Sequence, residues 1–87
     1  MPLIQDDDGG RLEIRGRGFV YYYNAQGHGY QVSSEMVASD EYSIAIYASD
    51  VELIGAGTQV TGLEKDEVIS RVRKLCEKGK VRIRVFE

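Results

Sequence analysis

The chain of 87 residues holds one histidine and one cysteine, the side chains most often used for proton transfer and nucleophilic attack near neutral pH. His28 lies between two glycines, and no serine or cysteine motif supplies the nucleophile that a general base would activate. Cys76 falls on an apolar stripe with Val72 and Leu75, where a thiol behaves as a small hydrophobe. We therefore predict an exposed His28, a buried Cys76 and no enzymatic activity.

Two further segments have the composition of ligand sites but not the spacing. Asp6-Asp7-Asp8 lacks the later oxygen ligands and the distal glutamate of a calcium loop. Gly55-Ala-Gly57 precedes a helix by too many residues, and no Gly-Lys-Ser/Thr follows it as in a phosphate-binding loop. The sequence therefore predicts no metal and no cofactor.

The acidic pairs Asp40-Glu41 and Asp50-Glu52 flank one predicted strand at its two ends. A strand of that length separates them by ~25 Å, too far for a two-carboxylate hydrolase. Two interpretations stay open: solvated loop charge, or an acidic rim around a binding face.

Charge is distributed unevenly along the chain. Between Arg17 and Lys65 there is no lysine or arginine, whereas this stretch contains six acids, Phe19 and all six tyrosines. Tyrosine is large and stiff with a polar tip, which suits protein contact surfaces. An acidic field around such rings favours a basic partner, and an isoelectric point near 5.1 argues against nucleic acid.

Alternating and turn-forming residues predict the elements of the first half. Residues 1–10 are expected to form a flexible tail, followed by a single domain over residues 11–87. Segments 11–15, 19–23 and 30–32, separated by glycine-rich turns, predict a three-stranded antiparallel meander.

The second half contains two more strand patterns, a helix and a last strand. Tyr42–Ala48 carries no charge on either face, which predicts a strand covered on both faces or one whose outer face meets another subunit; Val51–Ile54 predicts a short fifth strand. A helix is predicted from Thr61, as N-cap with Glu64 in a capping box, to Gly79, as the C′ residue. Its apolar stripe consists of residues 68, 69, 72, 75 and 76.

These elements predict an α+β domain: a mainly antiparallel sheet of about five strands, a helix packed on one face, and a C-terminal strand. Val81, Ile83 and Val85 are expected to face inward along that last strand. It pairs either beside the fourth strand after a crossover, or antiparallel at the other edge, and the sequence leaves both arrangements open.

The outward tyrosines are the candidate contact residues. If the face of Phe19 is buried, Tyr22 and Tyr47 point outward. We therefore predict a partner-binding surface with Tyr22 and Tyr47 as anchors and an acidic rim of Asp40, Glu41, Asp50 and Glu52.

A hydrophobic skeleton with a few polar positions runs through residues 11–78. It consists of Leu12–Arg15, Tyr21–Tyr23, Ser34-Glu35-Met36, Ile44–Val51 and a helix with Glu67, Ile69 and Leu75. This skeleton resembles that of immunity protein 74, a family of small predicted immunity proteins from bacterial polymorphic toxin systems. Glu35, Met36, Tyr47 and Ser49 are family-like positions without an established role, and Leu53–Gly55 stand where the family has a tryptophan. The resemblance implies a non-enzymatic protein that neutralises a toxin by binding it.

The function predicted from the sequence is therefore protein binding, with a basic toxin as the implied partner, by a cytoplasmic homodimer. The cytoplasmic assignment comes from the single cysteine and from the lack of a signal-like or membrane-spanning segment. Two alternatives are a structural or regulatory homodimer joined through its uncharged strand, and a nucleic-acid binder that uses Arg82 and Arg84.

Overall fold

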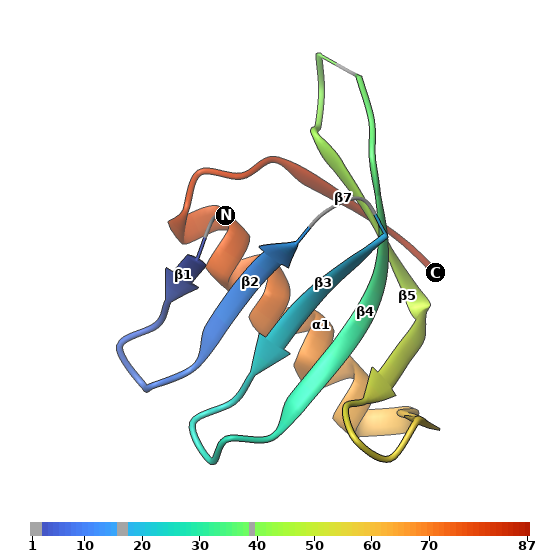
Figure 1. Cartoon of the computed structure of the whole chain (residues 1–87). Helices are drawn as coiled ribbons and strands as arrows, with labels where there is room; N and C mark the ends of the chain where they lie inside the picture. The colour runs from blue at the N-terminus through green and yellow to red at the C-terminus, as the bar shows by residue number, and fades with distance from the viewer. Residues whose placement is uncertain (1–2, 16–17, 39) are drawn as a thin grey trace.

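The computed structural model describes residues 3–15, 18–38 and 40–87, in which seven strands form one sheet and a single helix lies across one face of it (Figure 1). The elements are β1 Leu3–Gln5, β2 Arg11–Arg15, β3 Phe19–Tyr23, β4 Gly29–Met36, β5 Ile44–Leu53, β6 Thr58–Gln59, α1 Gly62–Lys78 and β7 Ile83–Phe86. The predicted α+β class, the initial meander, the helix and the C-terminal strand are confirmed, and the sheet has one strand more than the six segments predicted.

The first six strands lie side by side in chain order, each antiparallel to its neighbour. β7 leaves this order, because the chain returns across the sheet after α1 and β7 pairs with β5 in parallel, with Ile44 opposite Ile83 and Tyr47 opposite Phe86. Of the two arrangements left open by the sequence, the crossover beside β5 is therefore the one adopted.

β5 is one ten-residue strand where the sequence predicts two shorter ones. Its pairing with β4 jumps from Val51 opposite Val32 to Ile46 opposite Ser34, so that β5 has extra residues between these pairs. Such a bulge lets a strand continue while the alternation of its side chains shifts. The break in the hydrophobic pattern between Ala48 and Val51 therefore corresponds to a bulge within one strand and not to the end of a strand.

The N-terminal segment is predicted to be a flexible tail, whereas Leu3–Gln5 pair with β2 as an edge strand. A turn follows, in which the backbone N–H of Asp6 donates to the carbonyl of Gly10 at 2.7 Å. Arg71 of α1 donates to the Asp8 carboxylate at 2.8 Å. Residues 3–10 thus have a strand partner on one side and helix contacts on the other.

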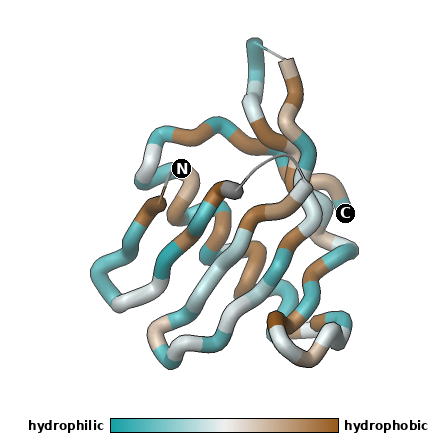
Figure 2. The backbone as a smooth tube through the Cα atoms, viewed as in Figure 1, coloured by the Kyte–Doolittle hydropathy of each residue, from teal (hydrophilic) through white to brown (hydrophobic). Residues whose placement is uncertain are grey.

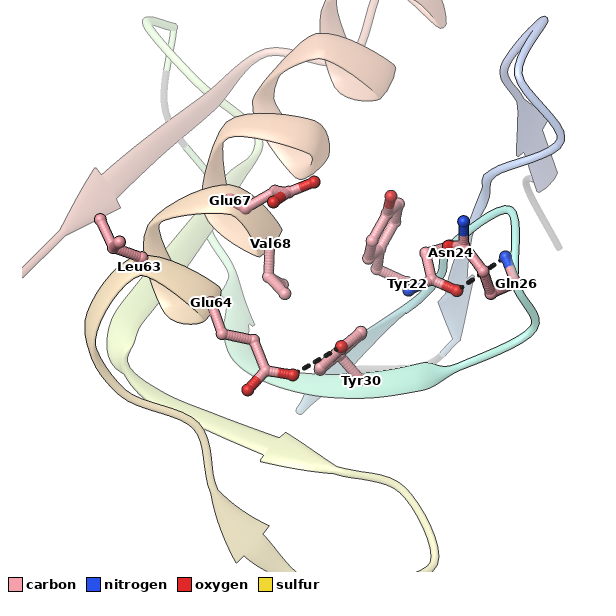
Figure 3. Close-up of a pocket in the computed structure, with 8 residues that line it drawn as sticks. All are labelled: Tyr22, Asn24, Gln26, Tyr30, Leu63, Glu64, Glu67 and Val68. Carbon is pink, nitrogen blue, oxygen red and sulfur yellow. Dashed lines mark hydrogen bonds between the residues drawn. The ribbon is translucent and has the colours of Figure 1, made fainter.

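α1 begins after Thr61, as predicted, but the predicted capping box does not form. Thr61 makes no side-chain capping hydrogen bond. The carboxylate of Glu64 instead accepts a hydrogen bond from the hydroxyl of Tyr30 on β4, with 2.8 Å between the two oxygens (Figure 3). Glu64, which would complete the capping box, is thus hydrogen-bonded to the sheet instead.

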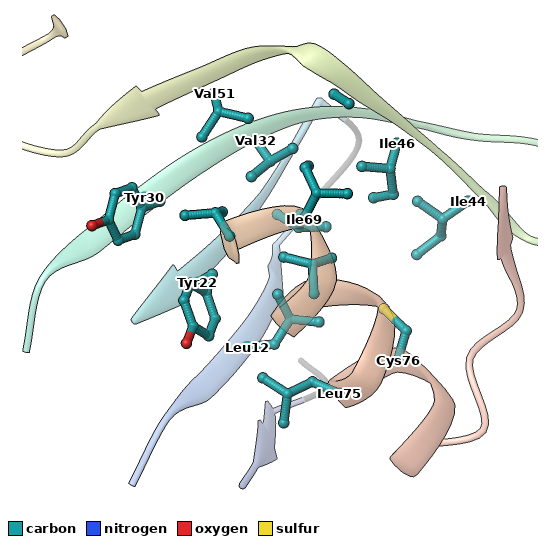
Figure 4. Close-up of a cluster of buried hydrophobic side chains, with 14 of the residues drawn as sticks. Leu12, Tyr22, Tyr30, Val32, Ile44, Ile46, Val51, Ile69, Leu75 and Cys76 are labelled. Carbon is teal, nitrogen blue, oxygen red and sulfur yellow. The ribbon is translucent and has the colours of Figure 1, made fainter. Parts of the chain in front are cut away.

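The core lies between the sheet and the helix (Figure 4). Alternate strand residues point toward α1, and hydrophobic and polar segments accordingly alternate along the strands and the helix in Figure 2. All five residues of the predicted helix stripe are buried, and the inward residues of the last strand pack against the same cluster. The fully buried side chains are Leu12, Val20, Val32, Ile46, Val51, Val72, Leu75 and Cys76.

Gly79 ends the helix as predicted, but for a different reason. Its φ of −84° is open to any residue, and the left-handed residue is Lys80 with a φ of 58°. A Cβ at position 79 would lie 2.5 Å from Cδ1 of Ile4 on β1. Glycine therefore leaves room for the Ile4 side chain, which any Cβ at this position would have to displace.

Gly79→Ala should lower the free energy of unfolding by about 1–3 kcal/mol, because the added methyl overpacks this contact. In an Ile4→Ala background, which removes the atoms in the way, the same substitution should cost much less. Urea denaturation of the four proteins measures both costs. An equal cost in the two backgrounds would mean that Ile4 is not the reason for the glycine.

Candidate protein-binding face of the sheet

One face of the sheet is covered by α1 and the other is uncovered (Figure 1). The chain has six tyrosines and two phenylalanines, and only Tyr22 and Tyr30 are buried. The other rings lie on the uncovered side, on β3, β5, β7 and the loop before β5. Large rings gathered on one face outside the core form an apolar surface of the kind that marks interaction sites.

Tyr22, predicted as an outward anchor, is 5% exposed and belongs to the core. It stands opposite Leu12 on β2 and Tyr30 on β4, in a row of side chains that faces the helix. Its ring stacks on Tyr30 with 6.1 Å between centroids. The prediction assigned the buried and exposed faces of β3 the wrong way round. Tyr22 pairs with the buried Leu12 on β2 and therefore points to the same face, whereas Phe19 points outward.

Tyr47 lies on the uncovered face, as predicted, and is half-buried there. Its hydroxyl donates to Oε2 of Glu35 on β4 at 2.9 Å, and its ring stacks on Phe86 at 6.0 Å. The hydrogen bond to Glu35 is the main reason that the pKa of Tyr47 lies above its usual value. The tyrosine therefore keeps its proton and is held in one orientation by two contacts.

The outward rings form two clusters. The first, which we call the β3 cluster, consists of Phe19, Tyr21 and Tyr23, and the guanidinium of Arg11 lies 4.2 Å from the centre of the Tyr23 ring. The second, the β5–β7 cluster, consists of Tyr42, Tyr47 and Phe86, with the Arg84 guanidinium 5.4 Å from the Phe86 ring. Each cluster therefore combines apolar area with hydroxyl groups and one cation.

Between the clusters, β4 and β5 present a strip of carboxylates made of Glu35, Asp50 and Glu52. The hydroxyl of Ser33 donates to Asp50, and the amide of Gln59 donates to Asp50 at 2.9 Å and to Glu52 at 3.2 Å. These hydrogen bonds, the one from Ser33 foremost, hold the pKa of Asp50 below its usual value. Among the described residues, no lysine or arginine forms an ion pair with any of the three carboxylates.

The two pairs of predicted rim acids lie toward opposite ends of β5, as their spacing in the sequence predicts. Asp50 and Glu52 lie within β5 on the uncovered face, whereas Asp40 and Glu41 lie in the loop that precedes β5, at its opposite end. The carbonyl of Asp40 accepts a hydrogen bond from Nη1 of Arg82 at 2.6 Å. The acidic feature is therefore a strip through the middle of the face and not a rim around it.

Sequence reasoning missed the β3 cluster, although a signal for it was present. Leu12 and Ile14 alternate with charged residues on β2, which sets the buried face of that strand. An antiparallel hairpin carries this parity to β3 and makes Phe19, Tyr21 and Tyr23 the outward residues.

The two residues best suited to chemistry occupy the predicted environments. His28 is exposed, and its backbone N–H donates to Oδ1 of Asn24 in a turn. Cys76 is buried, and burial raises the pKa of its thiol to about 11. In the described part of the chain, no three His, Cys, Asp or Glu side chains are grouped closely enough to hold a metal ion.

No family model, no curated protein and no solved structure matches this chain. Within residues 3–15, 18–38 and 40–87, no helix has the length and apolar character needed to cross a membrane.

Proposed function

We propose that this chain is a non-enzymatic binding protein that docks a basic protein partner on the uncovered face of its sheet. One observation carries the proposal: six aromatic rings lie outside the core, in two clusters, around three carboxylates that no described cation neutralises. Binding hot spots combine rigid aromatic anchors with charge complementarity in this way.

In this proposal the two parts of the face have different tasks. The β3 cluster and the β5–β7 cluster supply apolar contact area, and the strip of Glu35, Asp50 and Glu52 attracts the basic surface of the partner. Function then follows from occlusion, because a partner held across the sheet is shielded from its own target. An immunity-type protein that neutralises a toxin, as the family resemblance implies, acts by this mechanism in a cytoplasmic setting.

Asp50→Asn combined with Glu52→Gln should slow association with the captured partner by about tenfold at low salt. The reason is that both carboxylates contribute to the attraction before contact and form no ion pair with a described lysine or arginine. The association rate should also become less dependent on salt. Surface-based kinetics at several ionic strengths measure both effects.

The matched control is Asp66→Asn combined with Glu77→Gln, which removes the same charge from two exposed positions on α1. It should leave the association rate nearly unchanged. Equal slowing by the two double variants would assign the effect to net charge alone and remove the strip from the site.

The nucleic-acid alternative is weaker for a structural reason. The Arg82 guanidinium donates to the carbonyl of Asp40, and the Arg84 guanidinium lies over the rings of Tyr42 and Phe86. Both arginines are thus engaged by their own chain and would have to leave these contacts to reach a phosphate.

A further inference from the structure

A second site opens on the helix side of the molecule, away from the uncovered face. It is a cavity of about 350 Å³ between the β3–β4 hairpin and the first turns of α1 (Figure 3). The stacked rings of Tyr22 and Tyr30 form one wall, Glu64 and Glu67 form the other, and Val68 closes the apolar base. A smaller cavity of about 160 Å³ shares Tyr22 and Glu67 with it and extends the cleft toward Arg71.

One carboxylate of the cleft is fixed by the sheet. The hydroxyl of Tyr30 donates to Oε2 of Glu64 at 2.8 Å. Burial, followed by this hydrogen bond, raises the pKa of Tyr30 to about 12, so that the tyrosine keeps its proton and Glu64 remains the acceptor. The other oxygen of Glu64 has no hydrogen-bond partner among the described residues.

Two polar groups of the cleft lack any partner in the described part of the chain. The carboxylate of Glu67, one helical turn after Glu64, makes no hydrogen bond and no ion pair there. The hydroxyl of Tyr22 makes no hydrogen bond there either, and the residue as a whole is 5% exposed. This hydroxyl lines the cavity beside the free carboxylate of Glu67, so both groups are open to a ligand.

The charge of the cleft decides the sign of that ligand. Glu64 and Glu67 make the wall negative, and the nearest cation, Arg71, is occupied by Asp8 at 2.8 Å and by Asp6 at 4.0 Å. An anion is therefore disfavoured. A cation gains both carboxylates and the lone pairs of the Tyr22 hydroxyl.

We propose that this cleft binds a primary ammonium group carried on an unbranched alkyl chain. The ammonium has three N–H donors, and Glu64, Glu67 and the Tyr22 hydroxyl offer three acceptors from different directions. The alkyl chain lies along Val68 and the tyrosine rings, where it displaces water from apolar surface. A lysine side chain of another protein and a free alkylamine both carry this group.

The test is an NMR titration of the whole chain with n-butylammonium, and with n-butanol as the uncharged probe of similar shape. The ammonium should shift the resonances of Tyr22, Tyr30 and Glu67 to saturation, with a dissociation constant on the order of millimolar for so small a ligand. The alcohol should bind at least about tenfold more weakly. Equal binding of the two probes would overturn the proposal.

Two variants separate binding from folding. Glu67→Gln should weaken n-butylammonium binding at least about tenfold, whereas Glu77→Gln, with the same charge change at the other end of α1, should not. Tyr22→Phe should weaken binding about threefold to tenfold and leave the unfolding midpoint unchanged, because the lost hydroxyl has no partner in the free protein. Unaltered binding in Glu67→Gln would also overturn the proposal.

A parallel titration with a blocked lysine tripeptide distinguishes the two sources of the group. Binding of the tripeptide as tight as that of n-butylammonium supports a lysine side chain presented by a protein. Binding of the free amine alone supports a small-molecule amine. Binding of neither contradicts the assignment of the cleft.

Discussion

Leu75→Ala is expected to lower the free energy of unfolding by about 2–5 kcal/mol. Leu75 is 1% exposed and lies on the face of α1 that covers the sheet. Truncating it leaves a cavity between two rigid layers that relax only partly, so the loss exceeds the transfer free energy of the methyl groups. A domain of this size is stable by only about 5–15 kcal/mol, so the variant is expected to lose a large fraction of its stability.

The same helix supplies the matched control. Leu63 is 87% exposed, so Leu63→Ala should change the free energy of unfolding by no more than about 0.5 kcal/mol. Urea denaturation monitored by circular dichroism measures both variants, with equal slopes as the check on two-state unfolding. Equal destabilisation by the two substitutions would mean that α1 does not pack on the sheet through its predicted stripe.

The second large effect is expected on partner binding, in the double variant Tyr21→Ala and Tyr47→Ala. Each tyrosine comes from a different aromatic cluster on the uncovered face. A hot-spot tyrosine contributes about 2 kcal/mol or more, which corresponds to roughly 30-fold in affinity. Because the two clusters lie on either side of the carboxylate strip, the two losses should be nearly additive, and most of the loss should appear as faster dissociation.

Tyr47→Phe is the conservative control for this variant. It removes only the hydroxyl that donates to Glu35 and keeps the ring that stacks on Phe86. If the ring is the anchor, Tyr47→Phe should cost only about threefold to tenfold in affinity. Unchanged affinity in the double alanine variant, with the fold intact by circular dichroism, would exclude the uncovered face as the binding surface.

The elements that the sequence predicts well are those with an uninterrupted period. The helix stripe over residues 68–76 repeats every three or four residues, and all its members are buried. The alternating residues Val81, Ile83 and Val85 likewise pack against the core. A sustained period leaves one side of an element apolar, and burial of that side follows whatever the neighbouring elements are.

What the sequence did not predict depends on contacts between segments that lie far apart in it. β1 is ordered by β2 and by the end of α1, where Ile4 approaches Gly79. The bulge in β5 is fixed by its register with β4. Glu64 does not cap the helix because its carboxylate accepts the hydrogen bond of Tyr30, which is distant in the sequence. Local propensity contains none of this information.

The candidate site was predicted in part for the same reason. Tyr47 lies on the uncovered face, because its side follows from the alternation of one predicted strand. Asp50 and Glu52 lie on the same face only because the bulge in β5 shifts that alternation. Tyr22 does not lie on the uncovered face. Pairing with β2 decides which residues of β3 point inward, whereas the prediction considered β3 alone. Asp40 and Glu41 lie at the opposite end of β5 from Asp50 and Glu52, as the sequence predicts.

The central claim is that a partner occupies the uncovered face, and comparative affinity capture tests it most directly. Three immobilised proteins are compared in lysate of the source organism: the parent chain, the Tyr21→Ala/Tyr47→Ala variant and Leu63→Ala. We expect the parent and Leu63→Ala to retain the same basic protein in equimolar amount, and the double tyrosine variant to lose it. Retention by the double variant, or capture of nothing by a parent chain that light scattering finds to be a dimer through this face, would contradict the account.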